Sequence, residues 1–260
     1  MAGGIELHQE VDSEASRPNR SSDKTTSVTV VDRLWKAALD VVFPIDCLGC
    51  GSRGRFVCPS CVDRMPKLER PFCTVCANPG VAGICSWCQA HAPSIDAIRS
   101  PYLYVPSSPI YRAITSLKYG GMRSIAPELA ELLYAFWGTR RTADPDIIVP
   151  VPSHPSRVRQ RGYSQASLIA AELGRRMNVS VSTDTLLRVK NAPSQLETES
   201  REDRWSNVQG GFRSRSHVDG ARVLLVDDLV TTGSTASACA AALKMAGAHR
   251  VVGLSLARAP

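Results

Sequence analysis

The sequence predicts an α/β protein in which a small cysteine-rich module precedes an open parallel sheet with helices on both faces. Three observations lead to this prediction. After Tyr104, short apolar runs alternate with segments of helical periodicity, which is the pattern of repeated β-α-β units. Eight of the nine cysteines fall in four C-x-x-C pairs within one short stretch. The hydrophobic fraction of 43% is typical of a chain with a packed core.

The N-terminal region is predicted to contribute little to that core. Residues 1–28 are polar, mixed in charge and without periodicity, which favours a disordered tail. Residues 29–45 are predicted to form a short helix, with an apolar face in Val31–Phe43 and a stop at Pro44. The first residues lack the basic-then-apolar plan of a signal peptide, and no apolar run approaches the roughly 20 residues that span a bilayer. We therefore expect a cytoplasmic protein without membrane insertion.

The cysteine-rich module is predicted over residues 46–89. A tetrahedral Zn²⁺ takes four thiolates and each C-x-x-C turn supplies two, so four turns would hold two structural ions. Without an export signal, metal ligation is favoured over disulfides. Pairing of sequential turns is the simplest arrangement, and a cross-brace is the alternative. The predicted ligands of this double zinc ribbon are Cys47, Cys50, Cys58, Cys61, Cys73, Cys76, Cys85 and Cys88.

The elements of the α/β domain, predicted over residues 90–260, follow from periodicity. Residues 90–104 lead into a first strand, and further buried strands are predicted at Asp146–Pro152, Ala221–Val226 and Arg250–Leu256. Helices are predicted at 110–117, 125–137, 164–177 and Thr235–Ala246, the last with Cys239 on its buried face. Residues 186–212 show little apolar periodicity and are predicted to form a long functional loop.

The segment VLLVDDLVTTGST, residues 223–235, carries the strongest chemical signal. Its strand is predicted to end at the paired acids Asp227 and Asp228, before a turn rich in hydroxyls into a helix. Unpaired N–H groups at a helix N-terminus bind phosphate, and Gly233 lets the backbone approach the ligand closely. Carboxylates beside a phosphate need hydroxyls, a metal ion or positive charge as partners, and a phosphorylated ribose with Mg²⁺ offers all three. The alternative is a plain acid-tipped strand with a tight turn into a helix.

This segment resembles the motif of type I phosphoribosyltransferases that binds phosphoribosyl pyrophosphate (PRPP). The resemblance implies a type I phosphoribosyltransferase-like sheet. It also implies that Asp227 and Asp228 hold the ribose hydroxyls and Mg²⁺ and act in catalysis. The residues that would bind the 5′-phosphate are Thr231, Thr232, Gly233, Ser234 and Thr235.

Further segments resemble those of the ComF family. They are LKYGG at 117–121, VPVPSHPSRVRQRGYSQA at 149–166, and a later stretch with Gln195, Arg201, Asn207 and Phe212. Members of that family combine a cysteine-rich zinc module with a phosphoribosyltransferase-like domain and are linked to DNA uptake during natural transformation. The resemblance therefore implies PRPP as ligand and DNA-uptake proteins as partners.

Basic residues follow the strand predicted at 146–152. The segment Ser153–Gly162 lies at the carboxyl end of that strand, where α/β folds bind ligands. In type I phosphoribosyltransferases a pyrophosphate loop occupies this position, so arginines here would neutralise the departing group. A solvated basic helix start is the alternative. The candidate residues are Lys118, His154, Arg157, Arg159 and Arg161. Lys118 also suits a helix C-terminus. The role of His154 is open between an acid, a phosphate contact and a plain loop residue.

Three functions are compatible with these features. The first is Mg²⁺-assisted transfer of phosphoribosyl from PRPP to a nitrogenous acceptor, with release of pyrophosphate. The second is a non-catalytic protein that binds nucleotides or single-stranded DNA, and the third is a scaffold for uptake or repair proteins. The net charge of +7 suits an anionic ligand or nucleic acid but selects neither.

Overall fold

The computed structural model describes residues 44–140, 144–190 and 200–259. These residues belong to one compact unit that starts at Pro44. The predicted tail, nearly all of the predicted N-terminal helix, and Gln195 lie outside the described residues.

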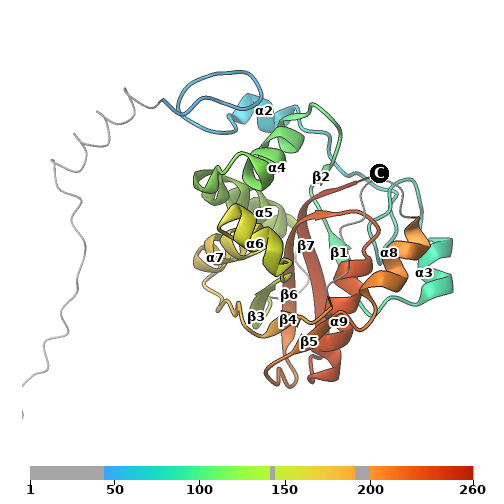
Figure 1. Cartoon of the computed structure of the whole chain (residues 1–260). Helices are drawn as coiled ribbons and strands as arrows, with labels where there is room; N and C mark the ends of the chain where they lie inside the picture. The colour runs from blue at the N-terminus through green and yellow to red at the C-terminus, as the bar shows by residue number, and fades with distance from the viewer. Residues whose placement is uncertain (1–43, 141–143, 191–199, 260) are drawn as a thin grey trace, which may run out of the picture. The chain divides into compact units, whose positions relative to one another are not determined.

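The centre of the fold is a five-stranded sheet in the order β1-β7-β6-β3, with β2 also paired to β7 (Figure 1). Every pair in it is parallel, as the alternation of strands and helices predicts. Its strands are β1 (Ala97–Arg99), β2 (Tyr102–Leu103), β3 (Ile147–Pro150), β6 (Arg222–Val230) and β7 (Arg250–Arg258). A separate antiparallel pair consists of β4 (Leu186–Arg188) and β5 (Phe212–Ser214).

Helices cover both faces of the sheet, which confirms the predicted fold class. Alternate residues of a strand point to opposite faces, so Leu224 and Val226 of β6 lie in one core and Val223 and Leu225 lie in another. The first core also contains α4 (Pro109–Tyr119), α5 (Ala126–Arg140) and α7 (Gln165–Met177), and the second contains α9 (Ser234–Met245) with the fully buried Cys239. Shorter helices are α2 (Pro59–Asp63), α3 (Ser86–His91), η1 (Arg123–Ile125), α6 (Pro155–Arg161) and α8 (Arg201–Val208).

Two predictions about elements were wrong. The strand predicted to end at Val226 continues through both acids to Val230, because β7 goes on pairing with it: Leu229 lies opposite Ala257 and Val230 opposite Arg258. Residues 186–212 are also not one loop, since their described parts form β4, α8 and β5.

The helix α8 has a start signal that does not depend on apolar periodicity. The Ser200 hydroxyl accepts a hydrogen bond from the Asp203 amide, and the Asp203 carboxylate accepts one from the Ser200 amide. This reciprocal capping box stabilises a helix end without any apolar residue.

No helix in the described part of the chain combines the length and the apolar character that crossing a membrane requires.

Candidate functional site

The turn between β6 and α9 forms an open helix N-terminus at the carboxyl end of the sheet. Gly233 is the N-cap of α9, has a φ of +83° and, as a glycine, offers no side-chain cap of its own. The Thr232 hydroxyl accepts a hydrogen bond from the Ser234 amide at 3.3 Å and lies 2.7 Å from the Ser234 hydroxyl. First-turn amides and adjacent hydroxyls at a helix N-terminus are suited to an anion. The structure therefore has the glycine turn into a helix that the sequence predicts, and phosphate binding there stays a prediction.

The two acids of β6 lie on opposite faces of the sheet because they are neighbours in a regular strand. Asp228 lies on the face of α4, where its Oδ1 is 2.9 Å from Nζ of Lys118 and both side chains are largely buried. Asp227 lies on the face of α9, within electrostatic reach of Cys239, and accepts a hydrogen bond from the Asp228 amide at 2.8 Å. A ligand that uses both carboxylates must therefore approach the strand end-on.

The electrostatics of these groups differ. Burial, together with the negative charge of Asp228, raises the pKa of Asp227 to about 7. Burial alone would lower the pKa of Lys118, but the charge and hydrogen bond of Asp228 outweigh that effect and raise it. Lys118 is therefore a cation held on Asp228, and Asp227 is poised to ionise near neutral pH.

The basic segment Ser153–Gly162 forms the helix α6 instead of an extended loop. Its local sequence explains this: Pro155 occupies the first helical turn, His154 accepts a hydrogen bond from the Ser156 amide as N-cap, and Gly162 ends the helix with a φ of +75°. The conformation of this segment is therefore that of a basic helix start, the alternative to a pyrophosphate loop.

The C-terminal end of α6 lies beside the C-terminal end of α4. The Arg161 guanidinium lies 4.9 Å from the centre of the Tyr119 ring, and Tyr163 donates a hydrogen bond to the carbonyl of Leu117. Arg157 is within electrostatic reach of the half-buried Arg188 of β4. The structure thus brings Arg161 close to the residue after Lys118, and Arg157 close to a second arginine.

The eight cysteines form two tetrads in the simplest, sequential arrangement. In each tetrad the Sγ atoms all lie within 4.8 Å of one another. Three of the Sγ–Sγ distances are 3.6 Å (Cys50–Cys58), 3.7 Å (Cys76–Cys85) and 3.8 Å (Cys73–Cys88). Zn–S bonds of about 2.3 Å in a tetrahedron place sulfurs about 3.8 Å apart. Both tetrads therefore fit zinc.

The two tetrads have similar local structure but different surroundings. Cys58 and Cys85 are the N-caps of α2 and α3, with φ/ψ of −73°/157° and −71°/158°. In the first tetrad Cys50 is exposed, whereas all four cysteines of the second are buried. The backbone of the first ribbon contacts α5, since the amides of Phe56 and Val57 both donate to the Glu128 carboxylate.

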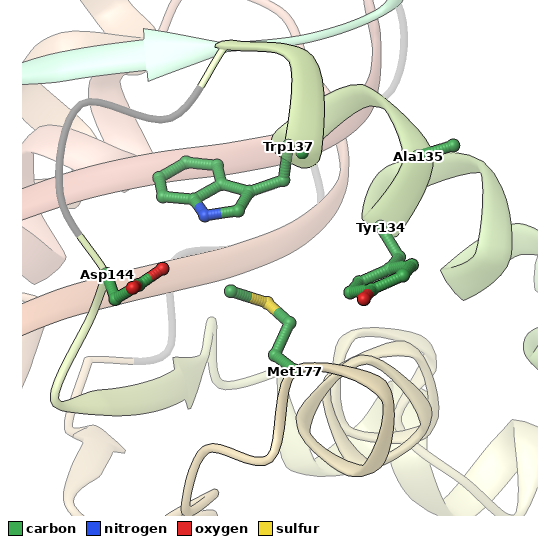
Figure 2. A pocket seen from close by; sticks show the side chains of 6 residues that line it. Tyr134, Ala135, Trp137, Asp144 and Met177 are labelled. Carbon is green, nitrogen blue, oxygen red and sulfur yellow. The ribbon is translucent and has the colours of Figure 1, made fainter.

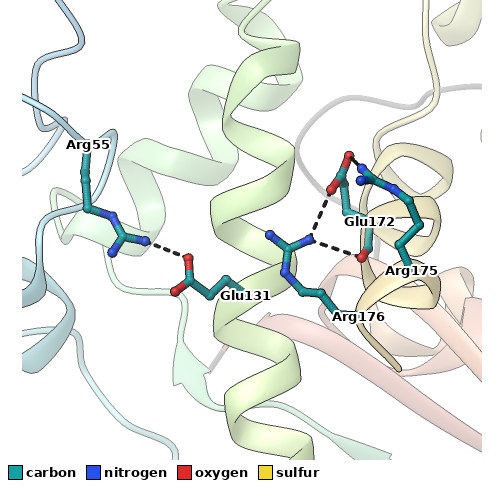
Figure 3. A network of polar contacts seen from close by, with 5 residues as sticks. All are labelled: Arg55, Glu131, Glu172, Arg175 and Arg176. Atoms are coloured by element: carbon teal, nitrogen blue, oxygen red, sulfur yellow. Dashed lines mark hydrogen bonds and ion pairs between the residues drawn. The ribbon is translucent and has the colours of Figure 1, made fainter. Parts of the chain in front are cut away.

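An exposed ion pair adds to the contact between the first ribbon and α5. Nη2 of Arg55 lies 2.6 Å from Oε2 of Glu131 (Figure 3). Figure 3 also shows a separate cluster in which Glu172 of α7 pairs with Arg175 and Arg176 of the same helix. Surface pairs of this kind contribute little to stability, so neither marks a site.

A pocket of about 270 Å³ opens at the end of the sheet where the strands begin, opposite their carboxyl ends (Figure 2). It is lined by the ends of α5 and α7 and by Asp144, which precedes β3. Parallel α/β sheets bind ligands at the carboxyl ends of their strands, and this pocket lies at the amino ends. It is therefore separate from the candidate phosphate site.

Arg258 is a residue of interest that sequence reasoning missed. It lies in β7 opposite Val230, is 2% exposed, and donates from Nε to the carbonyl of Cys76 at 3.1 Å. In the sequence, Arg258 is visible as a charged residue at the end of the strand segment LSLAR. A charge in a central strand needs a buried partner, so this residue could have been singled out.

Comparison with known proteins gives the same two-part organisation. The double zinc ribbon domain family matches residues 38–92, and the phosphoribosyl transferase domain family matches residues 131–258. Competence protein F of Haemophilus influenzae is 31% identical over 212 residues, which cover 78% of this chain and 90% of that protein. DNA utilization protein YhgH of Escherichia coli K12 is 29% identical over 201 residues, covering 75% and 87%. Competence protein ComFC of Bacillus subtilis is 28% identical over 193 residues, covering 69% and 74%.

Proposed function

Because this chain belongs to the ComF family, we propose that it binds PRPP at the turn between β6 and α9 and takes part in the uptake or use of DNA. The observation that carries the ligand proposal is the N-terminus of α9 at the N-cap Gly233, which lies five residues after Asp228, the second of two acids near the carboxyl end of a central strand. Relatives named for competence and for DNA utilization support the link to DNA.

The residues of the site have distinct proposed roles. The amides and hydroxyls of Thr231, Thr232, Gly233, Ser234 and Thr235 bind the 5′-phosphate. Asp227 and Asp228 bind the ribose hydroxyls and the Mg²⁺ that accompanies the diphosphate. Mg²⁺, when bound, neutralises charge on the diphosphate.

Lys118 is proposed to leave Asp228 when the ligand binds there. In the free protein it neutralises Asp228 at 2.9 Å. A ribose hydroxyl or a cation at Asp228 competes with that ion pair, so ligand binding releases the Lys118 ammonium. The released cation, with His154, Arg157 and Arg161 of the neighbouring segment, then faces the diphosphate.

Transfer to an acceptor is the catalytic extension of this proposal. As pyrophosphate leaves the ribose, positive charge develops on the sugar carbon, and a carboxylate of Asp227 or Asp228 stabilises it. The acceptor is a nitrogen nucleophile. Asp227→Asn and Asp228→Asn should then greatly reduce pyrophosphate release in acceptor screens while the fold is retained, and unchanged release would remove this mechanism.

The experiment that tests the binding proposal is a calorimetric titration of the zinc-loaded full-length protein with PRPP, with and without Mg²⁺. We expect saturable heat that depends on Mg²⁺ and that is lost in Asp227→Asn and Asp228→Asn. Asp219→Asn is the matched control, because that side chain is 79% exposed and pairs only with His217 among the described residues. No saturable heat in either condition would exclude PRPP as the ligand.

Binding of single-stranded DNA is a second candidate function. Tyr119 is 75% exposed and carries the Arg161 guanidinium over its ring, and exposed aromatic rings with arginines bind unpaired bases. We expect DNA affinity to fall with salt by a slope of about −0.7 per neutralised phosphate. Tyr119→Ala should weaken binding with little change in slope, and affinity that does not depend on salt would contradict this candidate.

A further inference from the structure

The second cysteine tetrad (Cys73, Cys76, Cys85, Cys88) lies directly behind the candidate phosphate-binding turn. A Cβ atom at Gly233 would lie 3.7 Å from Cβ of Cys76 and 3.1 Å from Cδ1 of Ile98. Ile98 of β1 in turn donates its amide to the carbonyl of Val75 at 2.7 Å. The ribbon backbone, β1 and Gly233 therefore pack without intervening solvent, so a displacement of Cys76 displaces the support of the turn.

Arg258 links the same tetrad to the strand that leads into the turn. Its backbone pairs with Val230, three residues before Gly233. Its buried guanidinium donates to the Cys76 carbonyl at 3.1 Å and to Oδ1 of Asn78 at 3.2 Å. No carboxylate among the described residues forms an ion pair with it. Four thiolates exceed the charge of a zinc ion by two, so the loaded tetrad itself supplies the negative charge.

A second arginine ties α8 to the tetrad. Nη2 of Arg201 lies 3.9 Å from Sγ of Cys76, and the guanidinium lies 4.4 Å from the Trp87 ring. Trp87 stacks on His91 at 3.7 Å and meets Trp205 of α8 edge-on at 6.3 Å. Arg201 and Arg258 together balance the two excess negative charges of the loaded tetrad. The start of α8 and the end of β7 are thus both attracted to the negative charge of the loaded second tetrad.

The first tetrad makes none of these contacts. Its ribbon packs on α4 and α5: a Cβ at Gly49 would lie 3.3 Å from Pro109, and Arg112 donates to the Leu48 carbonyl at 3.2 Å. Its cation is Arg64, which donates to Sγ of Cys61 at 3.0 Å and belongs to the ribbon itself. Loss of this tetrad would therefore leave the support of Gly233 in place.

We propose that metal binding at the second tetrad positions the phosphate-binding turn, and that metal binding at the first tetrad does not. Occupancy of the second tetrad then sets the affinity for the phosphorylated ribose, and Arg258 is the positioning residue between them. The affinity part rests on the proposed PRPP binding. The ordering of the turn can be measured independently, because the amides of Ser234 and Ser237 are hydrogen-bonded to Thr232 and to Gly233.

Matched cysteine variants test the proposal in the full-length protein. Cys85→Ser and Cys58→Ser remove equivalent N-cap ligands from the second and the first tetrad. Each should lose one zinc ion by metal analysis. Cys85→Ser should also lower PRPP affinity by about tenfold or more, comparable with the effect of outer-shell changes on the activity of metal sites, and speed hydrogen exchange at Ser234 and Ser237. Cys58→Ser should leave both the PRPP affinity and the exchange of these amides close to the wild-type values.

Amides of the central strands are the folding control. If residues 223–226 and 251–254 stay protected in both variants, the sheet is intact. Equal effects of the two variants, or slow exchange at Ser234 and Ser237 in Cys85→Ser, would overturn the proposal. If the wild-type protein does not bind PRPP but Cys85→Ser still frees the turn, the PRPP proposal fails and the positioning role stands.

Stepwise chelation of the wild-type protein provides a test that needs no variant. The first tetrad has an exposed cysteine and the second has none, so the first zinc ion to leave should come from the first tetrad. PRPP affinity and slow exchange of the turn should survive its loss and disappear with the second ion. Loss of both properties with the first ion, or survival of both after the second, would contradict the proposal.

Discussion

At the residue scale, Asp227 lies in an environment that disfavours the charged form of its carboxyl. Its carboxyl is confined between the sheet and α9 and lies next to a second acid, so its pKa rises to about 7. Without a ligand, Asp227 is therefore mostly protonated below about pH 7. A Mg²⁺-bound ligand would favour its ionised form. We therefore expect this residue to couple ligand binding to pH.

The stability of the apo protein should consequently fall as pH rises from about 4 to about 7. In that interval the folded state holds a proton on Asp227 that the unfolded state has released, so the free energy of unfolding decreases with pH. Asp227→Asn removes this decrease, and at pH 8 the variant should be more stable than wild type by roughly 1–3 kcal/mol. Urea denaturation at several pH values measures it, and parallel pH profiles would contradict the assignment.

Lys118 and Asp228 form the buried ion pair of the same site. Lys118→Met leaves the Asp228 carboxylate buried without its cation, and we expect a loss of about 3 kcal/mol. The double variant Lys118→Met/Asp228→Asn removes the charge as well and should recover most of that loss. Urea denaturation of the two variants compares them, and equal losses would show that Lys118 contributes packing instead of charge.

At the scale of elements, the turn from β6 into α9 depends on one backbone conformation. Gly233 has a φ of +83° and lies against Ile98, so a side chain there is both strained and crowded. Gly220 has a φ of +69° with no heavy atom within 4 Å of its would-be Cβ. The pair separates backbone strain from crowding at the site.

Gly233→Ala and Gly220→Ala should each lower stability by about 1–2 kcal/mol, the cost of a left-handed alanine. Only Gly233→Ala should weaken PRPP binding, by about tenfold or more, because only there do the amides that we propose to bind phosphate shift. Calorimetric titration of both variants tests this. Equal affinities of the two variants would place the phosphate elsewhere.

At the scale of the whole molecule, the two zinc ribbons are attached to different layers of the fold. The first packs on the α4 and α5 side of the sheet, and the second packs behind β1 and the start of α9. Glu128 anchors the first ribbon by accepting two backbone amides. One turn later, the ion pair that Glu131 forms with the described residues is the exposed one with Arg55, with side chains 52% and 45% exposed.

Glu128→Ala should therefore destabilise the protein by about 1–3 kcal/mol, since it leaves two partly buried amides without an acceptor. Glu131→Ala on the same helix face should cost less than about 1 kcal/mol. Thermal or urea denaturation of the zinc-loaded variants compares them. A larger loss in Glu131→Ala would mean that the ribbon is held by surface charge instead of by its backbone.

The sequence by itself determined the features that depend on near neighbours. Short apolar runs determined the strands and period-3.6 apolar patterns determined most of the helices, because each side chain's burial follows from its own strand or helix. The C-x-x-C spacing determined the metal ligands, since each turn brings two thiolates together. The glycine and hydroxyls of residues 231–235 determined an open helix N-terminus.

The tertiary structure alone decided the features that depend on distant partners. Pairing with β7 carried β6 past both acids and put Asp227 and Asp228 on opposite faces. Packing of α4 placed Lys118 on Asp228. The attachment of each ribbon to its own face of the sheet likewise required the completed fold. Local patterns describe how a segment buries itself, whereas these contacts join segments far apart in the sequence, and no periodicity within one segment records its partner.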